Sequence, residues 1–187
     1  MNIFIIAGHS KPTPGATAYN GISEHTYTKE LQGLVIAKLK NYIALEGSSM
    51  EAKTDTENQS NAKVRALINA NATKGSRGID IHFNDNNIKA SGCEVIVSRN
   101  TSQENKDRAS RLVKRVSKCL GIPHRKRVAD RDWIYPDETY VGSLGILDKT
   151  KPPMLLLEVC FLNENNLPVY LANKYEVAQI IADELVG

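Results

Sequence analysis

Four side chains that can bind a metal or transfer a proton occur among residues of a different character. His9 follows a short apolar run, and His82 lies on the polar face of a segment in which apolar and polar residues alternate. Glu24 falls on the apolar stripe of an expected helix, and Glu158 interrupts an apolar run that should form a buried strand. Burying an unpaired carboxylate is costly, so each glutamate is expected to have a partner or a raised pKa.

Taken together, these residues form a donor set for zinc. His9, Glu24 and His82 match the two histidines and one glutamate of catalytic zinc sites, which leave the fourth position to water. Glu158 could then take a proton from that water and pass it to a leaving amine. The positions are too far apart to form a local motif. The ordinary alternatives are therefore an internal salt bridge for Glu158 and a hydrogen-bonded structural role for each histidine.

Apolar periodicity predicts strands that alternate with helices along the whole chain. Strands are expected at residues 3–9, 79–84, 93–98, 144–147 and 154–162, with a weak edge strand near 50–53, and helices at 23–42, 60–73, 102–120 and 174–186. This alternation predicts a three-layer α/β fold, with a twisted, mostly parallel mixed sheet of about six strands flanked by helices on both faces. Ligand sites in such sheets lie at the carboxyl ends of the strands, near His9 and Glu158.

Composition narrows the class of protein. The chain has 187 residues, 41% hydrophobic and 24% charged, which is typical of a globular protein rather than a disordered or fibrous one. A net charge of +3 falls short of a nucleic-acid-binding signature. Cys93, Cys119 and Cys160 are widely spaced and predict no disulfide framework; Cys160 is expected to be a small buried hydrophobe. With no signal-peptide pattern and no apolar run of about 20 residues, we expect synthesis in the cytoplasm and no membrane insertion.

Short motifs follow one another in a characteristic order over nearly the whole chain. They are Ala7-Gly8-His9, Pro14-Gly15-Ala16, Gly21-Ile22-Ser23-Glu24, Val64-Arg65, Asn69-Ala70-Asn71, Asp80-Ile81-His82-Phe83-Asn84, Gly92-Cys93-Glu94-Val95 and Leu157-Glu158-Val159-Cys160-Phe161-Leu162-Asn163. In these motifs the chain resembles the zinc-dependent N-acetylmuramoyl-L-alanine amidases of the amidase_3 type, found in bacterial autolysins and phage endolysins. It departs from their pattern at residues 10–13 and 77–79, and matches it poorly at 122–142.

The resemblance implies one Zn²⁺ per chain, with His9, Glu24 and His82 as ligands and Glu158 as the catalytic glutamate. It implies a twisted six-stranded sheet flanked by helices, and a single catalytic domain over residues 1–187 with no separate wall-binding domain. The reaction would be hydrolysis of the amide between N-acetylmuramic acid and L-alanine in peptidoglycan, leading to cell-wall degradation and lysis. We expect the protein to act on the wall after release at host lysis, as a phage or prophage lysin; the alternative is a housekeeping amidase exported by another route. A monomer is expected.

Asn84, Arg125, Arg127 and Trp133 are candidates for binding the substrate. The two arginines end a basic run that begins in the expected helix 102–120, and arginine suits bidentate capture of carboxylates in the wall. The alternatives are a solvated, charged helix face for the basic run and a packing role for Trp133. His25 adjoins Glu24 and could compete as a ligand, but on a helix it points about 100° away.

Three other functions compete with the amidase. One is a zinc peptidase or other amidohydrolase acting on free peptides, although Pro12 replaces the glutamate that carboxypeptidase-like spacing would place three residues after His9. Another is a non-catalytic peptidoglycan-binding module, which would be expected to have lost a ligand or the catalytic glutamate. A nucleic-acid binder is disfavoured because the sequence contains no motif for one.

Overall fold

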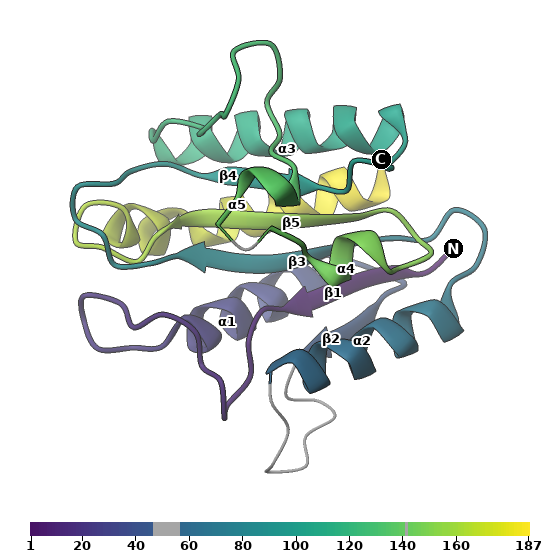
Figure 1. Cartoon of the computed structure of the whole chain (residues 1–187). Coiled ribbons are helices and arrows are strands. Elements are labelled where there is room, and N and C mark those ends of the chain that lie inside the picture. The colour runs from purple at the N-terminus through teal and green to yellow at the C-terminus, as the bar shows by residue number, and fades with distance from the viewer. Residues whose placement is uncertain (47–56, 141) are drawn as a thin grey trace.

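A five-stranded mixed sheet forms the centre of the computed structural model, which describes residues 1–46, 57–140 and 142–187 (Figure 1). The strands lie in the order β2-β1-β3-β5-β4; β2, β1, β3 and β5 run parallel, and β4 runs antiparallel to β5. Their bounds are Ile3–Ala7 (β1), Ile43–Glu46 (β2), Arg77–Asn84 (β3), Glu94–Val97 (β4) and Met154–Phe161 (β5). The α/β class and the mixed sheet are confirmed, with five strands in the described residues rather than about six.

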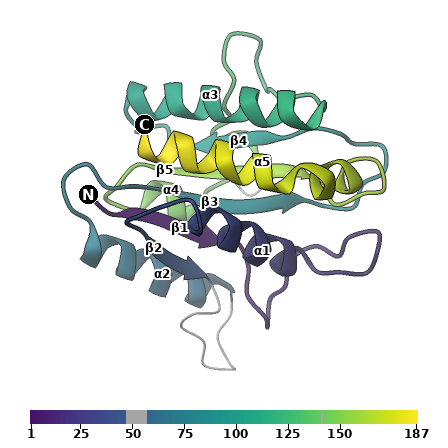
Figure 2. The same ribbon diagram turned by 180° about the vertical axis from the view of Figure 1, so that it is seen from behind.

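Helices cover both faces of the sheet, as the alternation of elements predicts. Three long helices, α1, α3 and α5, pack on one face, while α2 and the short α4 lie on the other (Figures 1 and 2). Their bounds are Glu24–Ile36 (α1), Glu57–Asn71 (α2), Gln103–Leu120 (α3), Gly145–Asp148 (α4) and Leu167–Val186 (α5), with a 3-10 turn at Pro136–Glu138. None of the described helices is long and apolar enough to cross a membrane.

Strand alternation divides the buried side chains between the two faces. In β3, Ile79, Ile81 and Phe83 enter the core shared with α1, α3 and α5. Asp80 and His82 point to the opposite face, where the smaller core beside α2 and α4 contains Leu156. The predicted polar face of this strand therefore lies on the less covered side of the sheet.

A β-bulge in β5 changes the predicted alternation. His82 pairs with Glu158, whereas Asn84 pairs with Phe161, so β5 contains one residue more than β3 over this interval. Cys160 consequently turns into the larger core, whereas regular alternation would have placed it on the same face as Glu158. It is fully buried, in agreement with its expected role as a small hydrophobe.

Several element boundaries differ from the predictions. Helix α1 ends at Ile36 rather than 42, and the segment after it forms the edge strand β2, which the sequence did not indicate. The expected strand at 144–147 is instead the helical turn α4, since short apolar runs fit a buried helix as well as a strand. Helix α5 begins at Leu167, seven residues early, because proline is well tolerated in a first helical turn. The weak edge strand near 50–53 lies outside the described residues.

Gly78 in β3, one of the positions where the sequence departs from the amidase pattern, lies tightly between β1 and β5. An added Cβ there would lie 2.7 Å from the Phe4 carbonyl oxygen and from the Met154 side chain. We expect Gly78→Ala to lower the free energy of unfolding by about 1–3 kcal/mol, because the packed strands must separate. The matched control is Gly33→Ala on the exposed side of α1, where a Cβ meets nothing within 4 Å. Alanine there should stabilise the helix by about 0.5–1 kcal/mol. Urea denaturation measures the free energy of unfolding of both variants. Equal changes in the two would contradict the close packing of the strands around Gly78.

Candidate metal centre

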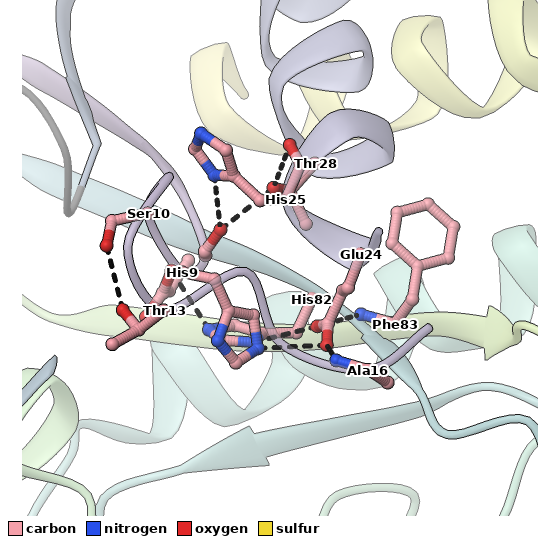
Figure 3. Close-up of polar contacts among 11 residues, drawn as sticks. His9, Ser10, Thr13, Ala16, Glu24, His25, Thr28, His82 and Phe83 are labelled. Atoms are coloured by element: carbon pink, nitrogen blue, oxygen red, sulfur yellow. Dashed lines mark hydrogen bonds and ion pairs between the residues drawn. The ribbon is translucent and has the colours of Figure 1, made fainter. Parts of the chain in front are cut away.

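Three predicted ligands meet at the carboxyl end of the sheet. His9 follows β1 and has φ of 65°, a left-handed conformation that histidine adopts more readily than most residues and that turns the chain out of the sheet. Such backbone strain is typical of functional sites. His82 lies near the end of β3, and Glu24 is the first residue of α1 (Figure 3).

Glu24 lies between the two histidines. Its Oε2 atom is 2.9 Å from Nε2 of His9, and its Oε1 atom is 3.2 Å from Nδ1 of His82. The imidazole rings stand edge to face, with centroids 4.9 Å apart. One ligand atom from each of the three residues lies within 4.8 Å of the others, a spacing that a single metal ion can bridge.

Backbone donors fix the carboxylate of Glu24. The N–H of Ala16 donates to Oε2 at 3.1 Å, and the N–H of Phe83 donates to Oε1 at 2.9 Å (Figure 3). Burial opposes ionisation of Glu24, but hydrogen bonds from His82 and His9 outweigh it and hold the pKa of Glu24 well below its usual range. The carboxylate therefore stays charged, as a metal ligand must.

The surroundings of His82 also fit a cation. Burial alone would lower the pKa of His82, but the carboxylates of Asp80, Glu24 and Glu158 outweigh burial and raise that pKa well above its usual value. Three carboxyl groups close to one imidazole thus favour a positive charge at this end of the sheet. Nitrogen and carboxylate donors in such a setting suit a divalent metal.

The loop after β1 closes tightly over the ligands. Gly15 has φ of 74°, and a Cβ added there would lie 2.5 Å from Oε2 of Glu24 and 2.6 Å from the ring of His9. A side chain at this position would therefore displace two of the three ligands. His25, the possible competing ligand, lies outside the cluster; its Nδ1 atom is 3.3 Å from the carbonyl oxygen of Gly8, so it helps to hold the end of β1.

Glu158 lies beside the three ligands, paired across the sheet with His82 on one side and with Glu94 on the other. Its Oε2 atom is buried and has no hydrogen-bond partner within the described part of the chain, so no internal salt bridge explains this oxygen there. Burial raises the pKa of Glu158 to about 8; Glu24 and Glu94 add to the rise and His82 opposes it. Such a carboxyl group exchanges a proton near neutral pH, as a general acid–base residue does.

The four residues face a cleft of about 740 Å³, within the range of ligand-binding sites. Of the predicted substrate-binding residues, Asn84, Arg125 and Arg127 line this cleft. Trp133 does not; it is half-buried and packs against the larger core. The structure thus brings the four central residues and three of the four outer ones together.

Other residues of the cleft were not predicted as functional. Asp80 and Glu94 lie on the same sheet face as His82 and Glu158, and two-residue spacing from His82 could have identified Asp80. Nη1 of Arg125 is 3.3 Å from Oε2 of Glu94, and the Arg125 guanidinium stacks 5.0 Å above the ring of Phe161. Part of the Arg125 guanidinium is therefore already in contact with residues of the cleft.

Most of the basic run belongs to a surface network of ion pairs. Each pair joins α3 or the segment after it to a nearby carboxylate: Arg111 to Glu184 at 3.0 Å, Arg115 to Asp183 at 2.6 Å, Lys114 to Asp132 at 2.6 Å and Lys126 to Asp132 at 2.8 Å. These contacts favour a solvated, charged face over a binding patch for this part of the chain.

Comparison with known proteins agrees with this geometry. A family model described as Amidase_3, N-acetylmuramoyl-L-alanine amidase, matches residues 3–186. The chain belongs to the Amidase_3 family. Among curated proteins, none matches the chain.

Three solved structures share this fold over nearly their whole length. The catalytic domain of the CD27L endolysin targeting Clostridia difficile is 19% identical, with a TM-score of 0.76 over 100% of this chain and 97% of that one. The CwlD amidase from Clostridioides difficile, in complex with the GerS lipoprotein, is 15% identical, with a TM-score of 0.76 over 99% and 96%. The catalytic domain of CwlV from Bacillus (Paenibacillus) polymyxa is 23% identical, with a TM-score of 0.70 over 99% and 96%.

The raised pKa of Glu158 predicts a pH-dependent cost in stability without a metal. In the folded chain that pKa is about 8, whereas a glutamate in the unfolded chain titrates near its usual value, so the folded state holds an extra proton between these pH values. Stability should therefore fall as pH rises through this window, by up to about 1.4 kcal/mol per pH unit. Glu158→Gln has no such proton to lose. Urea denaturation with a chelator, from pH 4 to pH 9, should show the stability of the variant gaining on the wild type as pH rises. Parallel curves would contradict the assigned environment.

Proposed function

We propose that the chain hydrolyses the amide between the lactyl group of N-acetylmuramic acid and L-alanine in peptidoglycan, with zinc held by His9, Glu24 and His82. The proposal rests on one observation. One ligand atom from each of these three residues lies within 4.8 Å of the other two, in a chain of the Amidase_3 family. Glu158 lies beside them, opposite His82 in the sheet.

The donor set favours a catalytic zinc site over a structural one. Structural zinc sites have four protein ligands, whereas three ligands leave a position open for water or substrate. When bound there, zinc supplies a Lewis acid that polarises a carbonyl and brings the pKa of water towards ~7.

Glu158 is placed to carry the proton of the reaction. Its carboxylate accepts a proton from the water whose oxygen bonds to the lactyl carbonyl carbon. The same carboxyl group then donates the proton to the nitrogen of L-alanine as the carbon–nitrogen bond breaks. Beside a bound cation Glu158 ionises more readily, because an opposite charge favours the carboxylate. The products are a carboxylic acid on the sugar and a free amino group on the stem peptide.

The walls of the cleft suit a polar, anionic polymer. Asn84 and Arg127 lie in the lining, and Arg127 offers a guanidinium for bidentate contact with a carboxylate of the stem peptide. We assign the substrate contacts to Asn84, Arg125 and Arg127. Trp133 packs away from the cleft, so a direct contact between it and the substrate has no support from its position.

In the same proposal, the protein acts as a monomer on the bacterial cell wall after release or export, and degrades it as a lysin of phage or prophage origin does. The CD27L endolysin catalytic domain has the same fold and is a precedent for this setting. Neither nucleic acid nor membrane insertion is part of the proposed activity.

Digestion of purified peptidoglycan tests the reaction. We expect new amino-terminal L-alanine without new reducing sugars, loss of activity in a chelator, and recovery when zinc is added back, because the ligands bind the metal reversibly. Reducing ends alone would refute the amidase. Cleavage of free peptides with intact muramoyl–alanine bonds would instead favour a zinc peptidase.

Substitution of the proton carrier separates binding from chemistry. Glu158→Gln should keep its zinc and lose turnover by about 10²- to 10⁴-fold, the usual contribution of general acid–base catalysis. His9→Ala is the matched variant, expected to lose both zinc and turnover because a ligand is missing. Zinc content by elemental analysis and initial rates on peptidoglycan distinguish the two. A Glu158→Gln protein with wild-type turnover would remove this residue from the mechanism.

A further inference from the structure

His82 has a second carboxylate neighbour in addition to Glu24. Oδ1 of Asp80 lies 3.4 Å from Nε2 of His82, on the same strand and the same sheet face, two residues earlier. On the other side of the ring, Nδ1 faces Oε1 of Glu24 at 3.2 Å. The two ring nitrogens therefore face two different carboxylates.

The two ring nitrogens have different chemical roles in these contacts. A neutral imidazole has one N–H and one lone pair, and the hydrogen bond made by one nitrogen decides which nitrogen can bind a metal. Nδ1 points into the group formed with His9 and Glu24, so it is the nitrogen that can offer its lone pair there. Nε2 must then carry the proton and needs an acceptor.

Asp80 is well placed to be that acceptor. It is only 6% exposed, and apart from the 3.4 Å approach of His82 Nε2 its buried Oδ1 atom has no polar partner in the described part of the chain. Its neighbours across the sheet are Ile6 and Leu156, which have no polar side-chain atoms. Burying a carboxylate between two aliphatic residues is costly unless another group uses its charge.

The Nε2 edge of His82 is also enclosed by the backbone of Gly8, which directly follows β1. A Cβ added to Gly8 would lie 2.5 Å from Nε2 and from the adjacent ring carbon, so the backbone of Gly8 packs directly against this edge. Such packing leaves little room for water to replace the carboxylate as acceptor. Asp80 and Gly8 together fix the plane of the ring.

We propose that Asp80 is a positioning residue of the metal centre: it accepts the Nε2–H of His82 and fixes the tautomer that presents Nδ1 to the metal. The inference rests on the zinc site of the proposed function. Carboxylate partners of metal-binding histidines raise ligand basicity and hold ring orientation, and their loss weakens metal affinity by about 10- to 100-fold.

The test measures zinc binding and the imidazole proton rather than activity alone. Zinc affinity is determined by competition with a chromogenic chelator for the wild type, Asp80→Ala and the nearly isosteric Asp80→Asn. Both variants should bind zinc about 10- to 100-fold more weakly, with asparagine at the lower end because its amide oxygen still accepts a hydrogen bond. The matched control is Asp107→Ala on α3, which removes an exposed carboxylate outside the cleft that accepts from the side-chain N–H of Gln103 and should change zinc affinity by no more than about twofold because solvent screens it.

A proton–nitrogen correlation spectrum of the zinc-loaded proteins provides the second measurement. In the wild type the Nε2–H of His82 should give a downfield, slowly exchanging signal. This signal should shift in Asp80→Asn and exchange away in Asp80→Ala. A variant that is merely less stable would keep it.

The outcomes distinguish the inference from the function on which it rests. If Asp80→Asn binds zinc within about twofold of the wild type, where a lost orienting partner should cost at least about tenfold, Asp80 does not position His82. If affinity falls but the Nε2–H signal is unchanged, Asp80 acts by another route, such as direct ligation, and the inference is wrong. A wild-type protein that takes up no zinc would overturn the zinc site and this inference together.

Discussion

The bridging carboxylate of Glu24 is the contact on which the rest of the site depends. Each of its oxygens faces one histidine and accepts one backbone N–H, from Ala16 or from Phe83. One buried side chain thereby ties the start of α1 to the end of β1, to the loop after it and to β3. A carboxylate at 3% exposure is stable only with such partners, so the ligand geometry and the local fold have a common cause.

The topology of the sheet explains why the cleft opens where it does. Parallel strands β1, β3 and β5 end at the same edge, and α1, α3 and α5 fill the face behind them. On the other face α2 and α4 cover a smaller core, and the ends of β3 and β5 remain accessible. The bulge after Glu158 lets β5 place this carboxyl group in the cleft while Cys160, two residues later, packs in the core.

The parts of the fold and of the site that could be predicted from the sequence are those where a residue differs clearly from its neighbours. His9, Glu24, His82 and Glu158 were identifiable because each is polar in an apolar or strand-like setting, and the alternation of strands and helices was enough to predict the α/β class. Two short elements were not predicted correctly. The segments that form β2 and α4 are short, and pairing with β1 or packing on α2 decides their state more than local preference does.

Residues that lie beside the four central ones were harder still to predict. Asp80 could have been inferred only from its two-residue spacing from His82 on the same strand. Glu94 has an ordinary strand position, and only the register of β4 against β5 reveals that it lies beside Glu158. Trp133 illustrates the opposite case: its type and loop position suggested substrate contact, yet it is half-buried and packs against the larger core. Arg125 does line the cleft, but its pairing with Glu94 could not be inferred from the sequence. Long-range register and loop packing are properties of the folded chain, which local patterns do not contain.

The charge of the site follows from these partners. Asp80, Glu24, Glu158 and Glu94 line the cleft with the two histidines, and Arg125 pairs with only one of the four, Glu94. Carboxylates this close repel one another, so without a cation the folded chain must protonate some of them or lose stability. A cation that binds only the folded state relieves this repulsion and adds its binding free energy to folding. The acidic residues that make the metal-free site costly are therefore the same ones that favour a bound metal.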